Sequence, residues 1–232
     1  MLRRSVLLGT PLVLCLLELG HPLLDHMHTI SMLAPITTWW IILHLLLVPL
    51  FALMGWAIFL LIENIHSFAA TLSRYATIVY ISFAIAFDSA VGLTSGILVD
   101  NAAARPASEQ GVIQHALLEI FSNPAIIMSN FMVTLSGTIA ICAAAWSLAH
   151  VGVPRLPLII LLGTVLSTYS HALPFGPLGS ACFFLAALWI ELVWSKQLQK
   201  EGEANSQGKY HFTLPEGVVQ GQHHPPRDPS VK

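Results

Sequence analysis

Asp88 is the residue whose type and position point most directly to chemistry. It lies about halfway along the apolar stretch 75–99, where an ionised carboxylate in lipid costs about 2.5–3.5 kcal/mol. Ala84, Gly92 and Gly96 share its helical face, and small residues at this spacing let another helix approach closely. Asp88 is therefore expected near the bilayer midplane, facing a bundle interior. It acts there either as a proton, cation or catalytic site or as a protonated packing residue.

Other ionisable side chains gather toward one face of the chain. Glu18 and His21 have the Glu-x-x-His spacing that suits a metal, although Pro22 draws His21 out of helical geometry. His44 precedes Pro49, whose ring should kink the helix, either opening a pocket beside His44 or serving packing alone. His171 is a further candidate for a ligand or proton site. Four more residues are candidate metal ligands: His26, His28, His115 and Glu119.

The composition places these residues in a membrane protein. Of the 232 residues, 55% are hydrophobic and 9% are charged, against about 25% charged in soluble domains. The formal net charge of -2, with ten Lys and Arg spread along the chain, argues against a nucleic-acid partner. The cysteines Cys15, Cys142 and Cys182 sit singly in apolar runs, so neither a disulfide framework nor a CxxC site is indicated.

Six apolar stretches approach the roughly 20 residues that a membrane helix needs. Backbone groups in lipid must be paired within the segment, so these stretches are expected to be helices. We therefore predict an all-α polytopic membrane bundle over 1–195, with the lipid bilayer as its first partner. The expected spans are 5–20, 36–62, 75–99, 125–149, 156–172 and 178–194.

The basic residues orient this bundle. If the N-terminus is inside and six spans follow, Arg105 is the only Lys or Arg that falls outside. By the positive-inside rule, this distribution supports a plasma-membrane protein with both termini in the cytoplasm. The first span is expected to be an uncleaved anchor because no A-x-A-like site follows it, with a cleaved signal peptide as the alternative. The basic residues assigned to the inside are Arg3, Arg4, Arg74, Arg155, Lys196, Lys200, Lys209, Arg227 and Lys232.

Two segments outside the spans have characters of their own. In the outer loop at about 100–124, apolar and polar residues alternate with helical periodicity up to Asn123, which predicts a short amphipathic helix in the headgroup layer. The tail at 196–232 is rich in Gly, Gln, Pro and charge and is expected to be a disordered cytoplasmic segment.

Known reaction motifs are missing from the sequence. It contains no Gly-rich phosphate loop, no G-x-S-x-G, no H-E-x-x-H and no CxxC. Glu-Leu-Gly-His-Pro at 18–22, Leu-Val-Pro-Leu-Phe at 47–51 and the segment from Phe87 to Val99 resemble parts of uncharacterised bacterial multi-pass membrane proteins of similar length. This resemblance implies a six-span bundle and carries no activity or functional residues.

Three classes of function follow from these residues. The first is a non-enzymatic membrane protein that binds or moves a proton, cation or small ligand at a polar site around Asp88. The second is a metal- or haem-dependent enzyme or redox subunit that uses Glu18, His21, His44 and His171. The third is a structural or partner-binding scaffold.

Overall fold

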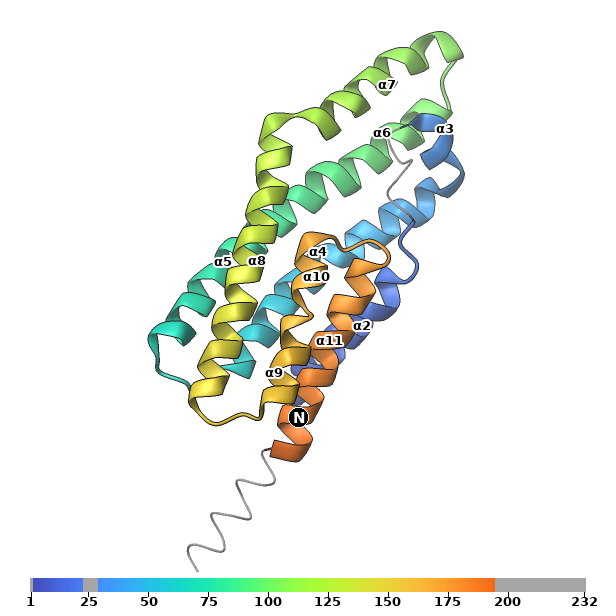
Figure 1. Cartoon of the computed structure of the whole chain (residues 1–232). Coiled ribbons are helices and arrows are strands. Elements are labelled where there is room, and N and C mark those ends of the chain that lie inside the picture. Colours follow the sequence, from blue (N-terminus) through green and yellow to red (C-terminus); the bar gives the residue numbers. More distant parts are fainter. Residues whose placement is uncertain (1, 23–28, 195–232) are drawn as a thin grey trace, which may run out of the picture. The chain divides into compact units, whose positions relative to one another are not determined.

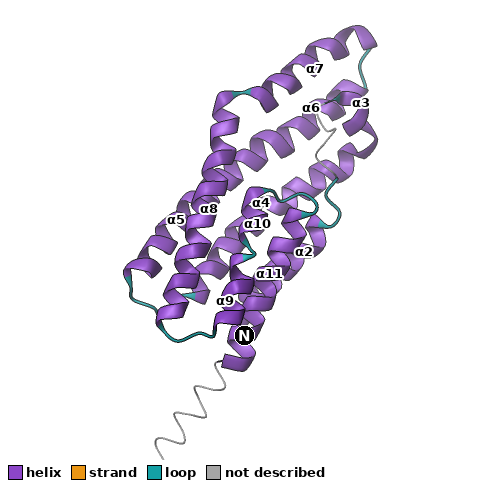
Figure 2. Cartoon of the chain, viewed as in Figure 1, coloured by secondary structure: helices purple, strands orange, loops and turns teal. Residues whose placement is uncertain are grey.

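The computed structural model describes residues 2–22 and 29–194, which belong to one compact unit, Met1–Ser195. These residues form helices and connecting loops, without a strand in either described range (Figure 2). The predicted all-α class is confirmed. The expected tail at 196–232 lies outside the described residues.

The helices follow the chain as expected, with bounds that differ at the ends. The N-terminal helix joins α1, η1 and α2, and the expected third span is continuous through a π-helical segment, η4. The elements are α1 (Leu2–Arg4), η1 (Ser5–Gly9), α2 (Thr10–Glu18), α3 (Ile30–Leu33), η3 (Ala34–Ile36), α4 (Thr37–Leu61), α5 (Phe68–Phe87), η4 (Asp88–Leu93), α6 (Thr94–Ala103), α7 (Ala107–Ser122), α8 (Pro124–His150), α9 (Arg155–Leu162), α10 (Val165–Tyr169), α11 (Phe175–Trp189) and η5 (Ile190–Trp194).

Four helices in the described part are long and apolar enough to cross a membrane. They are Ile30–Leu61, Phe68–Ala103, Pro124–His150 and Phe175–Trp194. The first and fifth expected spans are helical but shorter, and the fifth, Arg155–Tyr169, is interrupted between α9 and α10. The apolar helices fit an integral membrane protein.

The helices pack side by side around a large apolar core. α5 lies along α8, α2 lies along α11, and α4 contacts both α2 and α5 (Figure 1). Leu43, Leu47, Ile141, Leu161 and Phe183 are among the fully or almost fully buried core side chains. This core brings helices that are distant in sequence together.

One end of the bundle carries most of the described basic residues, and we call it the basic end. Arg3 bonds to Glu191 and lies 3.4 Å from Glu63 Oε2. Arg74 Nη2 donates to the carbonyl of Ile62 at 2.8 Å, just beyond the end of α4. The start of α1 and the ends of α4 and η5 therefore meet at this end.

At the opposite end, a smaller group of helices packs around an apolar cluster of its own. α7 packs beside α6 (Figure 1), and Ile30, Leu33, Val99 and Leu117 form a second apolar cluster there. The helix predicted for the outer loop is therefore present as α7, and it packs against α6. Asn123 then begins α8 by accepting a hydrogen bond from the Ala125 amide.

The expected close approach on the Asp88 face is made by α4. A Cβ at Gly92 would lie 2.0 Å from His44 Cδ2, and one at Gly96 would lie 2.7 Å from Ile41 Cγ1. The small residues therefore bring α4 against η4 and α6, which places His44 on the same face as Asp88.

Candidate functional site

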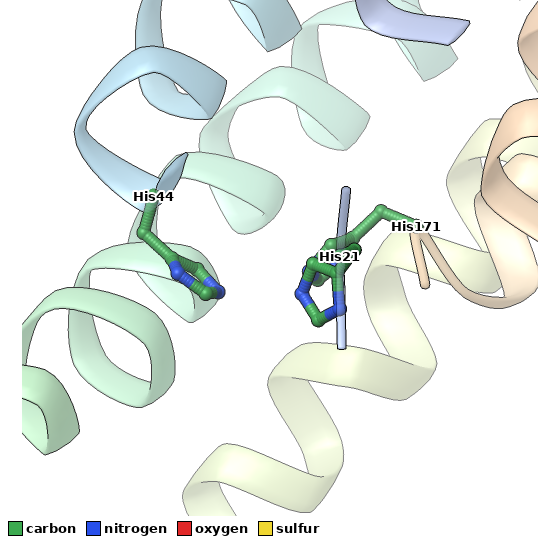
Figure 3. Close-up of side chains that lie close together, drawn as sticks. All are labelled: His21, His44 and His171. Carbon is green, nitrogen blue, oxygen red and sulfur yellow. The ribbon is translucent and has the colours of Figure 1, made fainter. Parts of the chain in front are cut away.

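Three histidines from distant parts of the sequence meet beside Asp88. His21 follows α2, His44 lies in α4, and His171 lies in the loop between α10 and α11. Figure 3 shows their side chains turned toward a common space. Each offers one ring nitrogen, and the three nitrogens lie within 4.8 Å of one another. We call these three residues the histidine cluster.

Backbone carbonyls fix two of the imidazole rings. His21 Nδ1 lies 2.8 Å from the carbonyl oxygen of Pro22, and His44 Nδ1 lies 2.7 Å from that of Trp40. A carbonyl can only accept, so Nδ1 carries the proton in both neutral rings and Nε2 keeps a lone pair. Histidine ligands of metals are commonly held in this way.

Asp88 opens the π-helical segment η4 and is 1% exposed. Its Oδ1 lies 3.8 Å from Nε2 of both His44 and His171, beyond hydrogen-bond distance. Neither carboxylate oxygen has a hydrogen-bond partner among the described residues. A buried carboxylate in this state is costly, so it calls for a bound cation, a ligand or a proton.

His21 Nε2 is a second buried polar atom with no hydrogen-bond partner in the described ranges. The His21 ring meets the His171 ring edge-on at a centroid distance of 4.8 Å, and it meets the His44 ring at 5.4 Å. The histidine cluster therefore surrounds a point at which lone pairs converge.

Trp40 forms one wall of the site and joins its two main helices. Its indole Nε1 donates to the carbonyl of Gly92 at 2.7 Å, and its ring lies 4.3 Å from that of His44. The hydroxyl of Ser95 also donates to the Gly92 carbonyl, at 3.1 Å. Side-chain donors thus satisfy a carbonyl of the π-helical segment, which stabilises the backbone that carries Asp88.

A cavity of about 200 Å³ adjoins the histidine cluster. The three histidines and Asp88 line it, and the remaining lining is mainly apolar. Its other lining residues are Trp40, Phe87, Val91, Gly92, Phe121, Ile126, Ile127 and Asn130.

The donor set fits a transition-metal ion. Neutral imidazole is a common ligand for zinc, copper, iron and nickel. Nitrogens at about 2.0–2.1 Å from a tetrahedral zinc ion are roughly 3.3 Å apart, so nitrogens that now lie up to 4.8 Å apart would approach by up to about 1.5 Å around an ion. Haem fits less well, because its large macrocycle would have to lie in the adjoining cavity, which measures only about 200 Å³.

The remaining sequence candidates have other surroundings. Glu18 is buried and accepts a 2.8 Å hydrogen bond from Ser180, away from the three ligand atoms. His115 and Glu119 pair at 3.3 Å on the exposed face of α7 and form no part of the cluster. His26 and His28 lie outside the described residues.

From the sequence, Asp88, His44 and His171 are candidates for a ligand or proton site, and His21 is a candidate metal ligand. The fold joins His21, His44 and His171 with Asp88 in one site. Trp40 was missed as a site residue, because a tryptophan near a span end is typical of an aromatic belt. Gly92 carried the usable signal, since a small residue one turn from Asp88 marks where another helix can bring a side chain.

Neither a protein-family model, a curated protein nor a solved structure matches the chain. The site must therefore be interpreted from its own geometry.

Proposed function

We propose that the chain is a six-span plasma-membrane protein, with both termini in the cytoplasm, that holds a divalent transition-metal ion on the histidine cluster. The observation that carries the proposal is the convergence of three imidazoles beside the buried carboxylate of Asp88, which has no hydrogen-bond partner within residues 2–22 and 29–194. The centre lies near the outer face of the membrane. Its ligands are His21, His44 and His171.

A metal ion explains more of the site than a proton does. A proton on Asp88 would neutralise the carboxylate but would leave His21 Nε2 without a partner. A divalent ion among the three rings would use that lone pair and those of His44 and His171. It would also balance the charge of Asp88 next to it, since a buried charge needs an opposite one.

The proposed centre is of the catalytic kind, and zinc suits it best. Structural zinc sites use four protein ligands, whereas catalytic sites use three and leave a position for water or substrate. Here three imidazoles supply the protein ligands, and the cavity of about 200 Å³ lies beside them. A zinc ion held there would lower the pKa of a bound water, and Asp88, whose Oδ1 lies 3.8 Å from Nε2 of His44 and of His171, would be the neighbouring base.

The lengths of the helices support a position near the outer face. His44 lies about 17 residues, or roughly 25 Å, from the end of α4 at the basic end, and Asp88 lies about 20 residues, or roughly 30 Å, from the start of α5. The hydrocarbon layer is about 30 Å thick. The helix Phe68–Ala103 has 36 residues, about 54 Å, so the middle of the helix is not the middle of the bilayer.

Two tryptophans on α4 support the same placement. Trp39 and Trp56 are both partly exposed, and about 17 residues of helix, roughly 25 Å, separate them. Tryptophans favour the two interfaces of a bilayer. Trp39 then marks the outer interface, and His44 lies about one turn beneath it.

The second candidate is a metal-free proton or cation site centred on Asp88. The lack of a hydrogen-bond partner for both carboxylate oxygens favours it. In that case His21→Ala would leave the function of the site intact, since His21 contributes neither of the 3.8 Å approaches to Asp88.

Elemental analysis separates the two candidates. We expect protein purified without chelator to carry about one transition-metal ion per chain, and His44→Ala to reduce this below about a tenth. His150→Ala is the matched control, because His150 Nδ1 also bonds to a backbone carbonyl one turn earlier but is exposed at the end of α8. A metal content of zero in the wild-type protein, or an unchanged content in His44→Ala, would contradict the proposal.

A further inference from the structure

We propose that the cavity beside the histidine cluster binds a membrane-dissolved amphiphile: a single alkyl chain with an anionic oxygen headgroup, either carboxylate or phosphate. The alkyl chain occupies the apolar part of the cavity, and the headgroup reaches the metal. The headgroup contact rests on the proposed metal centre. The cavity itself does not.

The lining of the cavity is divided in the way that an amphiphile requires. The histidines and Asp88, which lie close to one another, supply polar groups, and Phe87, Val91, Phe121 and Ile126 supply apolar side chains. Ligand sites are usually apolar with a few polar groups that fix the orientation of the ligand. A volume of about 200 Å³ accommodates a headgroup and the first part of a chain.

The cavity reaches an apolar part of the surface on α8. Ile127 lines it and is 58% exposed. Met128 and Phe131, on the same stretch of α8, are 58% and 56% exposed. In a membrane-spanning helix such side chains face lipid, so a chain can enter sideways and leave its remainder in the bilayer.

A more polar hollow lies on the other side of Ile126. It measures about 500 Å³ and is lined by Thr94, Glu119 and Asn123 among others, and Ile126 lines both spaces. The site thus has a polar neighbour toward α7 and an apolar surface along α8. A molecule at the boundary between headgroups and hydrocarbon experiences the same two environments.

Charge selects the kind of headgroup. A divalent ion beside the Asp88 carboxylate leaves a net positive centre with neutral histidines, and a low-dielectric cavity strengthens its attraction for an anion. Carboxylate and phosphate oxygens satisfy this centre equally, whereas a quaternary ammonium headgroup is repelled.

Photo-crosslinking in phosphatidylcholine nanodiscs tests the inference. The probe is a dodecanoate with a diazirine on its chain, and labelling is read by mass spectrometry. We expect saturable labelling near Phe121 and Ile127, suppressed at least about tenfold by unlabelled dodecanoate but not by acetate, because the chain supplies the apolar contact. Dodecyl phosphate as competitor distinguishes the two anions, and dodecyltrimethylammonium should not compete.

Two substitutions locate the binding. Val91→Phe fills the cavity, and Ile127→Trp obstructs its exposed edge with less risk to folding. Each should lower labelling at least about tenfold at unchanged metal content. Leu135→Phe is the control, since Leu135 is exposed on α8 and does not line the cavity.

The outcomes separate the two proposals. The amphiphile site is overturned if both Val91→Phe and Ile127→Trp are labelled as strongly as the wild-type protein. It is also overturned if acetate competes as strongly as dodecanoate. Metal measured on the same samples tests the proposed function independently, because a protein without metal contradicts the metal centre whatever the labelling shows.

Discussion

The basic end and the histidine cluster differ in how their acidic side chains are compensated by basic ones. At the basic end, Arg3 lies against both Glu63 and Glu191, so acids and bases compensate one another. Beside the histidine cluster, the carboxylate of Asp88 is more deeply buried than these acids, yet its nearest ionisable neighbours are imidazoles at 3.8 Å. The first arrangement is complete within the protein, and the second would be completed by the proposed metal ion.

Glu18 sharpens this comparison because it is a buried carboxylate only three residues before His21. It is 1% exposed, like Asp88, but it accepts a hydrogen bond from Ser180. Burial alone therefore does not identify the functional acid in this bundle. What distinguishes Asp88 is that neither carboxylate oxygen has a hydrogen-bond partner among the described residues and that three imidazoles lie beside it, which is why the proposal centres on Asp88.

The largest effect is expected from Gly92→Ala. The added Cβ would lie 2.0 Å from His44 Cδ2, so either the ring or the helix must move. We expect the free energy of unfolding to fall by about 1–3 kcal/mol and most of the metal to be lost, measured by denaturation and elemental analysis. In the control Gly111→Ala on α7, the added Cβ would have no atom within 4 Å, and stability should stay equal or rise by up to about 1 kcal/mol. Equal behaviour of the two variants would refute the packing argument.

Asp88→Asn comes next and affects the metal more than the fold. Metal affinity should fall by about 10–100-fold, as for other groups that support a metal site. The metal-free variant should be at least as stable as metal-free wild type, because an unpartnered buried carboxylate has been removed. Metal titration and denaturation after chelation measure the two effects. A large loss of stability without metal would instead assign Asp88 to helix packing.

Glu18→Ala should show the opposite pattern. Loss of the acceptor leaves the buried Ser180 hydroxyl without its partner, which should lower the free energy of unfolding by about 1–3 kcal/mol. The number of metal ions per chain should not change. Glu18→Gln retains an acceptor oxygen and should recover much of the stability. If Glu18→Ala abolished metal binding while the protein stayed folded, Glu18 would have to be counted among the ligands.

The smallest effect is expected at the basic end. The Arg3 and Glu63 side chains are 42% and 51% exposed, and exposed ion pairs contribute at most about 1 kcal/mol. Glu191 is only 10% exposed, but it keeps Arg4 as a second partner at 3.5 Å when Arg3 is replaced. Arg3→Gln should therefore change stability only slightly, less still at high salt, and should leave the metal content as in wild type. A strong dependence of metal binding on Arg3 would contradict the expected independence of the basic end and the histidine cluster.

The helical class and much of the helical pattern could be predicted from the sequence, because continuous apolar stretches dictate them. The face of Asp88 was also predictable from Gly92 and Gly96, which do contact α4. The meeting of His21 with His171 was not, because these residues are far apart in the chain and the order of helices in a bundle decides which ones meet. The loop carrying His171 depends on Gly176, where a Cβ would lie 2.0 Å from the His171 carbonyl oxygen.

The depth of Asp88 was predicted from the apolar stretch 75–99 alone. The helix begins earlier, at Phe68, and ends later, at Ala103. A helix longer than the bilayer has no unique midplane residue, so composition could not place Asp88. The depth of Asp88 stays a prediction, and the proposed position near the outer face rests on the partners at the basic end and on the tryptophans of α4.

X-ray absorption spectroscopy at the edge of the bound metal tests the central claim most directly. The wild-type protein should show three imidazole nitrogens at about 2.0–2.1 Å with one or more further oxygen ligands, the pattern of a three-histidine zinc centre. His21→Ala should reduce the imidazole count by one or abolish binding, and His115→Ala should leave the spectrum unchanged. A spectrum without imidazole scattering, or one identical in wild type and His21→Ala, would contradict a metal centre on His21, His44 and His171.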